Sequence, residues 1–65
     1  MKINKIQNGF LMNNQEYKII GKEEIISETQ VHVETDKGVI LLDTSVIIND
    51  NSFIDIIEFY NFLIN

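Results

Sequence analysis

The feature that most limits what this chain can fold into is the absence of cysteine from a sequence of only 65 residues. Chains this short bury a small hydrophobic core and usually gain stability from disulfides, a bound metal or oligomerisation. Without cysteine the first is excluded, and a single histidine, His32, cannot build a histidine-rich metal site. We therefore expect one domain over residues 1–65 with no metal and no cofactor, stabilised by contact with another chain.

The composition is that of a folded protein from an AT-rich genome. An apolar fraction of 45% and a charged fraction of 23% are ordinary for a folded domain. Isoleucine, asparagine and lysine are abundant, whereas alanine, arginine and proline are absent. The abundant three have AT-rich codons and the absent three have GC-rich codons, so codon usage explains the bias. A short reading frame of this kind suggests a phage or mobile-element origin.

The net charge of −5 bears on the class of partner. Five lysines, no arginine and ten carboxylates give no electrostatic footprint for nucleic acid, and they disfavour binding to anionic membranes. The carboxylates are densest in the middle of the chain. They form a hypothetical acidic docking face for a basic groove, or simply a solvated surface; its members are Glu23, Glu24, Glu28, Glu34 and Asp36.

Turn residues divide the first half of the chain into strands. Asn8-Gly9 lies between apolar segments and predicts a type I′ hairpin turn, in which both central residues have positive φ. Asn13-Asn14 is a second turn candidate because asparagine tolerates that region. A strand is expected from Glu16 to Ser27, with Gly21 marking a bulge where the alternation of faces changes.

The segment Gln30–Thr35 alternates strictly and predicts a half-buried strand with Val31 and Val33 inward and His32 outward and exposed. Gly38 is the expected positive-φ residue of the next turn. Val39–Leu42 is apolar on both faces, which predicts a strand in the centre of the sheet or one covered on both sides. A polar break follows, and then a short last strand over Val46–Ile48.

The C-terminal segment predicts the only helix, running from Phe53 to Ile64. Ser52 and Asp55 have the spacing of a capping box, and only Asp55, Glu58 and Asn61 interrupt the apolar residues. These three fall on one narrow stripe, so the helix carries more apolar surface than a small sheet can cover. Either loops cover the excess, or one flank is a protein interface that forms a homodimer or docks a different protein; the interface candidates are Phe53, Ile57, Phe59, Phe62 and Ile64.

The residues do not indicate a catalytic site. Three serines share a single histidine, and no nucleophile-elbow motif is present. The glycines Gly9, Gly21 and Gly38 are isolated, so no phosphate-binding loop is formed. We expect a protein with no catalytic residues rather than an enzyme.

The sequence thus predicts an α+β fold: a small antiparallel sheet of four to five strands within residues 2–48, an SH3-like half-barrel being one form of it, and one C-terminal helix over 53–64. The expected function is a small acidic protein-interaction module of the cytoplasm, a phage or mobile-element inhibitor of a host protein such as a defence nuclease. Two alternatives remain open. One is an oligomeric structural or assembly subunit, and the other is a weak nucleic-acid or nucleotide-binding barrel that uses Tyr17, Lys18 and Lys22.

Overall fold

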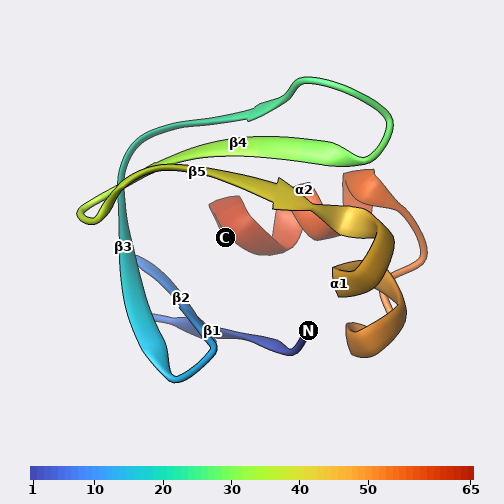
Figure 1. The fold of residues 1–65 in the computed structure, drawn as a ribbon, viewed down its shortest axis with the longest axis horizontal. Helices are drawn as coiled ribbons and strands as arrows, with labels where there is room; N and C mark the ends of the chain where they lie inside the picture. The colour runs from blue at the N-terminus through green and yellow to red at the C-terminus, as the bar shows by residue number, and fades with distance from the viewer.

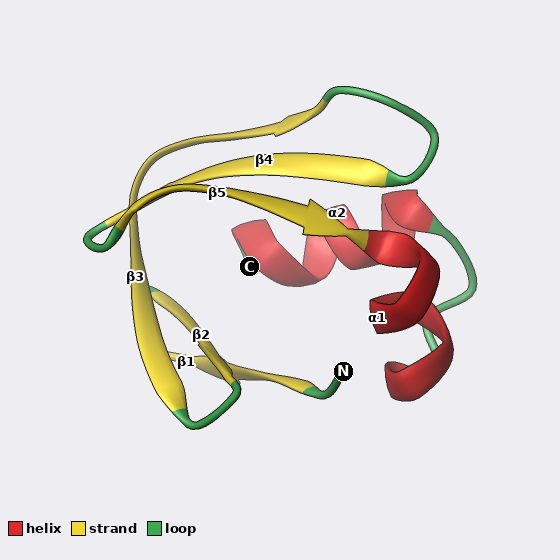
Figure 2. Cartoon of the chain, viewed as in Figure 1, coloured by secondary structure: helices red, strands yellow, loops and turns green.

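The computed structural model describes residues 1–65 and has a mixed α+β architecture of five antiparallel strands and two helices (Figures 1 and 2). The strands follow one another across a single sheet in the order β1-β2-β3-β4-β5. Their bounds are β1 Ile3–Ile6, β2 Gly9–Met12, β3 Gln15–Ile25, β4 Gln30–Thr35 and β5 Gly38–Asp43. The helices are α1 Thr44–Asn51 and α2 Ile56–Ile64.

The long strand β3 gives the sheet its curl. Its register against β4 shifts between Ile19 and Glu23, so the strand carries an irregularity around Gly21, where the sequence predicts a bulge. A bulge bends its strand and increases the local twist. As Figure 1 shows, β4 and β5 consequently lie on one side of α2, and β1 and β2 lie on the other.

The turns follow the asparagines and glycines with one displacement. Asn13 and Asn14 both have positive φ, 54° and 64°, and they join β2 to β3 as predicted. Gly38 also has positive φ, 106°. The first hairpin differs, because Ile6 pairs with Gly9 and leaves Gln7 and Asn8 as the turn residues. Gly9 is therefore a strand residue, and the predicted turn is wrong by one position.

Strands β4 and β5 correct the prediction for the end of the sheet. Val31 and Val33 are fully buried, which confirms the inward face of β4. His32 is half-buried rather than exposed, on the opposite face between Glu24 and Leu41. The predicted central position of Val39–Leu42 is wrong, because β5 is the last strand and no strand follows it.

The predicted strand over Val46–Ile48 is instead part of helix α1, so the fold has two helices and not one. The physical reason is the cap. The Asp43 carboxylate accepts hydrogen bonds from the Ser45 backbone nitrogen at 3.0 Å and from the Ser45 hydroxyl at 2.8 Å. These bonds favour the charged form and lower the pKa of Asp43 below its ordinary value. Such a cap satisfies a helix N-terminus and outweighs the β-branched residues that follow.

Helix α2 begins three residues later than predicted. Ser52 does not start a helix; it ends α1, with φ 61° and its backbone N–H bonded to the Ile48 carbonyl. Asp55 is the N-cap of α2 and accepts a hydrogen bond from the Glu58 backbone nitrogen at 3.0 Å. The Glu58 carboxylate in turn accepts from the Ile54 backbone nitrogen.

The core lies in the hollow of the curled sheet. Both helices contribute to it: Ile47 comes from α1, and Phe59 and Leu63 come from α2. All three have less than 3% of their surface exposed. The sheet supplies the other members, Ile3, Phe10, Met12, Val31, Val33 and Leu42.

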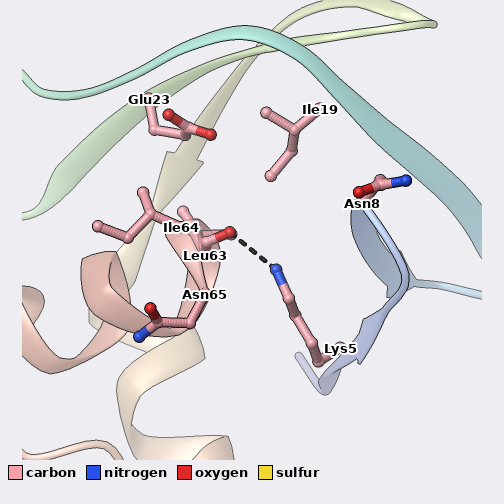
Figure 3. Close-up of a pocket in the computed structure, with 7 residues that line it drawn as sticks. All are labelled: Lys5, Asn8, Ile19, Glu23, Leu63, Ile64 and Asn65. Carbon is pink, nitrogen blue, oxygen red and sulfur yellow. Dashed lines mark hydrogen bonds between the residues drawn. The ribbon is translucent and has the colours of Figure 1, made fainter.

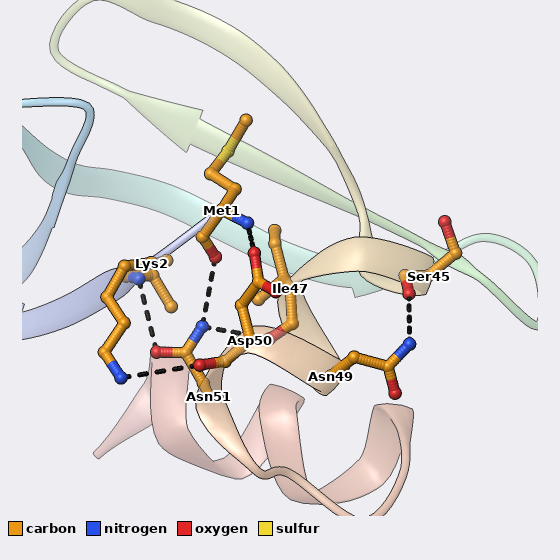
Figure 4. A network of polar contacts seen from close by, with 8 residues as sticks. Met1, Lys2, Ser45, Ile47, Asn49, Asp50 and Asn51 are labelled. Carbon is orange, nitrogen blue, oxygen red and sulfur yellow. Dashed lines mark hydrogen bonds and ion pairs between the residues drawn. The ribbon is translucent and has the colours of Figure 1, made fainter.

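Helix α1 holds the start of the chain (Figure 4). The Asn51 side-chain amide donates to the carbonyl oxygens of Met1 at 3.2 Å and Ile47 at 2.9 Å, and its oxygen accepts from the Ile3 backbone nitrogen at 3.3 Å. Lys2 donates to the Asp50 carbonyl at 3.4 Å, and the Met1 amino group forms an ion pair with the Asp50 carboxylate. These contacts hold Met1, Lys2 and the first residue of β1 against α1.

We expect Asn51→Ala to lower the free energy of unfolding by about 1–2 kcal/mol, because it removes the two hydrogen bonds that join α1 to Met1 and Ile3. Asn49→Ala is the matched control, since Asn49 is exposed and its amide donates only to Ser45 within the same helix. Urea unfolding followed by circular dichroism measures both changes. Equal, small effects of the two substitutions would contradict this role of Asn51.

Candidate protein-interaction surface

The polar side chains singled out in the sequence have mainly structural contacts. No group of three or more histidine, cysteine, aspartate or glutamate side chains lies close enough to hold a metal ion. The Ser45 hydroxyl donates to Asp43, and the Ser27 hydroxyl accepts from the Thr29 backbone nitrogen. Neither helix is long and apolar enough to cross a membrane.

A polar hollow of about 290 Å³ lies at the C-terminal end of α2 (Figure 3). The Lys5 ammonium reaches into it and donates to the Leu63 carbonyl at 2.9 Å. A cation at a helix C-terminus satisfies a free carbonyl and complements the helix dipole. The one cation of the hollow is thus engaged in fastening β1 to α2. The full lining is Lys5, Asn8, Ile19, Glu23, Leu63, Ile64 and Asn65.

The structure divides the predicted helical interface into two groups. Phe59 is fully buried, and Phe53 and Phe62 are half-buried beside it. The three rings form a cluster, with centroids 5.1–6.3 Å apart, so the aromatic surplus is packed inside the protein. Ile57 and Ile64 are exposed, with 54% and 47% of their surfaces accessible.

The predicted acidic residues do not share one face. Glu23 pairs with the inward residue Val33 and lines the polar hollow, whereas its neighbour Glu24 lies opposite His32 on the outer face. The Glu34 carboxylate accepts from the Lys22 backbone nitrogen at 2.7 Å. The Asp36 carboxylate accepts a hydrogen bond from the Lys18 backbone nitrogen at 3.0 Å. The Glu28 side chain is exposed and makes no hydrogen bond.

The aromatic residue proposed for nucleic-acid stacking is also occupied. Tyr17 is half-buried and stacks on Phe10, with ring centroids 5.2 Å apart and an angle of 18° between the planes. The Lys37 ammonium lies 5.1 Å from the Tyr17 ring centroid. Lys18 and Lys22 are exposed, but no free aromatic face accompanies them. The contacts therefore give the barrel alternative no stacking platform.

The open edge of β5 is the feature that the sequence reasoning missed. Thr44 donates its backbone N–H to Thr29 across the end of the β4–β5 ladder, and antiparallel ladders alternate in the direction of their hydrogen bonds. Ile40 and Leu42 therefore direct their backbone groups toward β4. The N–H and C=O groups of Val39 and Leu41 point away from β4, where the sheet has no further strand.

An apolar groove runs beside this edge. It has a volume of about 260 Å³, and seven of its eight lining residues are hydrophobic. We call it the β5 groove. It lies between β5, the first turn of α1 and the N-terminal end of the chain; the lining residues are Met1, Met12, Ile40, Leu41, Leu42, Asp43, Val46 and Ile47.

The two edges of the sheet differ in how they are protected. Edge strands are normally shielded by a covering element, by lysine or proline, or by a bulge. Strand β1 carries Lys5, and its Ile3 N–H is bonded by Asn51. Strand β5 has no charged residue from Gly38 to Leu42, and its Val39 and Leu41 side chains are 61% and 50% exposed. It is a template open to another strand.

Comparison with protein-family models, curated proteins and solved structures finds no match to this chain. The candidate site consequently rests on the geometry of β5 and its groove. A signal for it exists in the sequence, since Asp43-Thr44-Ser45 is a helix N-cap pattern. That pattern places a helix after Val39–Leu42 and so makes this apolar segment the edge of the sheet.

Proposed function

We propose that this chain is a small, non-enzymatic protein-interaction module that binds an extended segment of a partner protein along the edge of β5. The observation that supports the proposal is the row of unpaired backbone groups on Val39 and Leu41 beside the apolar β5 groove. In binding by strand addition, main-chain hydrogen bonds supply affinity and neighbouring pockets select side chains. The edge offers the bonds, and the groove offers an apolar pocket.

The proposed partner is a host protein, and binding inhibits it. The acidic, lysine-poor composition favours a protein ligand over nucleic acid. The codon bias toward isoleucine and asparagine supports a phage or mobile-element source, for which a host-defence nuclease is the model target. A cytoplasmic location belongs to the same proposal, as does the finer description of the curled sheet as an SH3-like half-barrel.

A second candidate function is an assembly subunit that pairs through α2. The exposure of Ile57 and Ile64, together with Ile54, which is 85% exposed just before the helix, favours it. These side chains are exposed apolar surface on α2 and just before it. Two copies related by a two-fold axis would bury part of this surface against itself.

Affinity capture from host lysate tests the first function with Leu41→Pro. The Leu41 N–H points away from β4, so proline there preserves the ladder while it removes a donor from the edge. Ile20→Lys is the control, because Ile20 is 69% exposed on β3, away from the edge. Circular dichroism verifies that each variant is folded.

We expect the wild type and the Ile20→Lys control to retain one host protein, and Leu41→Pro to retain at least about tenfold less of it, because main-chain bonds along the edge are lost. Equal retention by Leu41→Pro would contradict the β5 edge as the binding element. The absence of any protein retained by the wild type would contradict the interaction function itself.

A further inference from the structure

We propose that in the free protein the β5 edge is occupied by the β5 edge of a second copy, which gives a two-fold symmetric dimer with one sheet continuing through both chains. The inference rests on the proposed function in one respect, namely that this edge accepts an extended strand. The first strand to occupy the edge is the β5 strand of a second copy. A partner protein then competes with the second copy for the same backbone groups.

Backbone direction limits the register to pairings in which outward-facing residues lie opposite each other. In an antiparallel pairing centred on Ile40, Val39 of each copy lies opposite Leu41 of the other. Both residues direct their N–H and C=O groups away from β4, so each such pair exchanges two main-chain hydrogen bonds. The two-fold axis generates two of these pairs, and the contact closes on itself without leaving a free edge of β5.

The side chains fit this register. On the outer face, the exposed side chain of Val39 meets that of Leu41 from the second copy, an apolar cross-strand pair. On the inner face, Ile40 lies opposite Ile40. Leu42 lies opposite Gly38, which has no side chain to collide with the neighbouring first turn of α1.

Charge favours the same register over its neighbour. Centring on Ile40 brings Lys37, in the turn before β5, toward Asp43 of the other copy. There the Lys37 ammonium can exchange its contacts with the Glu16 carbonyl and the Tyr17 ring for that carboxylate. Centring on Leu41 places Asp43 opposite the apolar Val39 instead. Because each chain has a net charge of −5, two copies repel each other in general, and the uncharged segment Gly38–Leu42 is where they can approach most closely.

The small area of the contact favours a weak dimer. A stable interface typically buries about 800 Å² on each partner. One strand edge, with the exposed side chains of Met1 and Val46 at its margin, supplies less than that from a total surface of 4131 Å². The dimer is therefore concentration-dependent, with a dissociation constant in the micromolar range or above, and a better strand can displace it.

Sedimentation equilibrium of the full chain from about 5 μM to about 1 mM tests the dimer, because this range brackets dissociation constants of a weak interface. We expect the mass to rise from 7.6 kDa toward twice that value. Leu41→Pro removes two of the intermolecular hydrogen bonds and should raise the dissociation constant by about thirtyfold. Val39→Lys, which keeps every backbone donor but charges the edge, should weaken it as well.

Amide hydrogen exchange at both ends of this concentration range supplies a residue-level readout. The N–H groups of Val39 and Leu41 should become protected as the dimer forms, whereas those of Ile40 and Leu42, already paired with β4, should be protected throughout. Ile57→Lys on the exposed side of α2 is the control and should leave the dissociation constant unchanged.

A monomeric mass at the highest concentration would overturn the dimer, and so would a dimer dissociated by Ile57→Lys but not by Leu41→Pro. These failures are distinct from failure of the proposed function. If the chain is monomeric and Leu41→Pro still abolishes capture of the host protein, only the second copy as occupant is refuted. If the β5 dimer forms and no host protein is captured, the dimer stands and the interaction function fails.

Discussion

Phe59→Ala is expected to leave most of the protein unfolded in the absence of denaturant. The Phe59 side chain is completely buried among residues of the sheet and of both helices. Replacing a buried phenylalanine by alanine costs about 3–5 kcal/mol, which includes the cavity that remains. At about 0.05–0.15 kcal/mol per residue, the whole stability of a chain this short is of the same size. Far-UV circular dichroism and urea unfolding measure the loss.

Ile57→Ala is the matched control for Phe59→Ala, because it shortens another apolar side chain of the same helix. Ile57 is 54% exposed, so we expect a change within about 0.5 kcal/mol. The two variants also distinguish a core residue from a surface residue, since the sequence alone predicts both Phe59 and Ile57 as interface residues. Similar losses for the two variants would show that α2 does not direct Phe59 into the core.

Gly9→Ala is expected to have the second-largest effect, a loss of about 3 kcal/mol, at the upper end of what overpacking costs. A Cβ at this position would overlap the Tyr17 carbonyl group, which belongs to the backbone of the neighbouring strand β3. Neither strand can move away without disturbing the pairing of β2 with β3. Thermal and urea unfolding measure the loss.

Gly21→Ala controls for the general cost of replacing a strand glycine. A Cβ at Gly21 would meet the Glu34 carboxylate, which can swing away, and also the Glu34 Cβ, which is relieved only by a small shift of β4. The variant then loses the hydrogen bond from the Lys22 backbone nitrogen to Glu34, worth about 1 kcal/mol. A larger loss for Gly21→Ala than for Gly9→Ala would contradict the close approach of β2 and β3.

Local signals predicted those parts of the fold that depend on neighbouring residues. The alternation of Gln30–Thr35 identified β4 and its inward valines, because one face of that strand is buried and the other is not. Asn13-Asn14 and Gly38 adopt positive φ as their residue types favour. Gly21 marked the irregularity in β3.

The predictions that were wrong concern segments in which local preferences compete with one another or with tertiary contacts. Val46-Ile47-Ile48 favours a strand by composition, yet the Asp43 cap and the burial of Ile47 against the sheet select a helix. Asn8-Gly9 is a strong turn signal, but Gly9 is needed where the backbone of Tyr17 approaches β2. Close approach between strands is a tertiary effect that a dipeptide does not reveal.

The candidate site was predictable only in part. The sequence assigns the surplus of apolar side chains to the C-terminal helix, whose phenylalanines pack on one another while Ile57 and Ile64 are exposed. A further part of the exposed apolar surface lies at Val39 and Leu41. Their exposure follows from β5 being the last strand, which in turn follows from the helical start at Thr44.

The contacts between α1 and the start of the chain, and the entry of both helices into the core, make folding a collective event. The five strands pair only with their neighbours in sequence, so each hairpin can form early and locally. None of these hairpins is closed off from water until Ile47, Phe59 and Leu63 arrive from the last third of the sequence. A nascent chain must therefore be synthesised as far as Leu63 before its first strand is held in place.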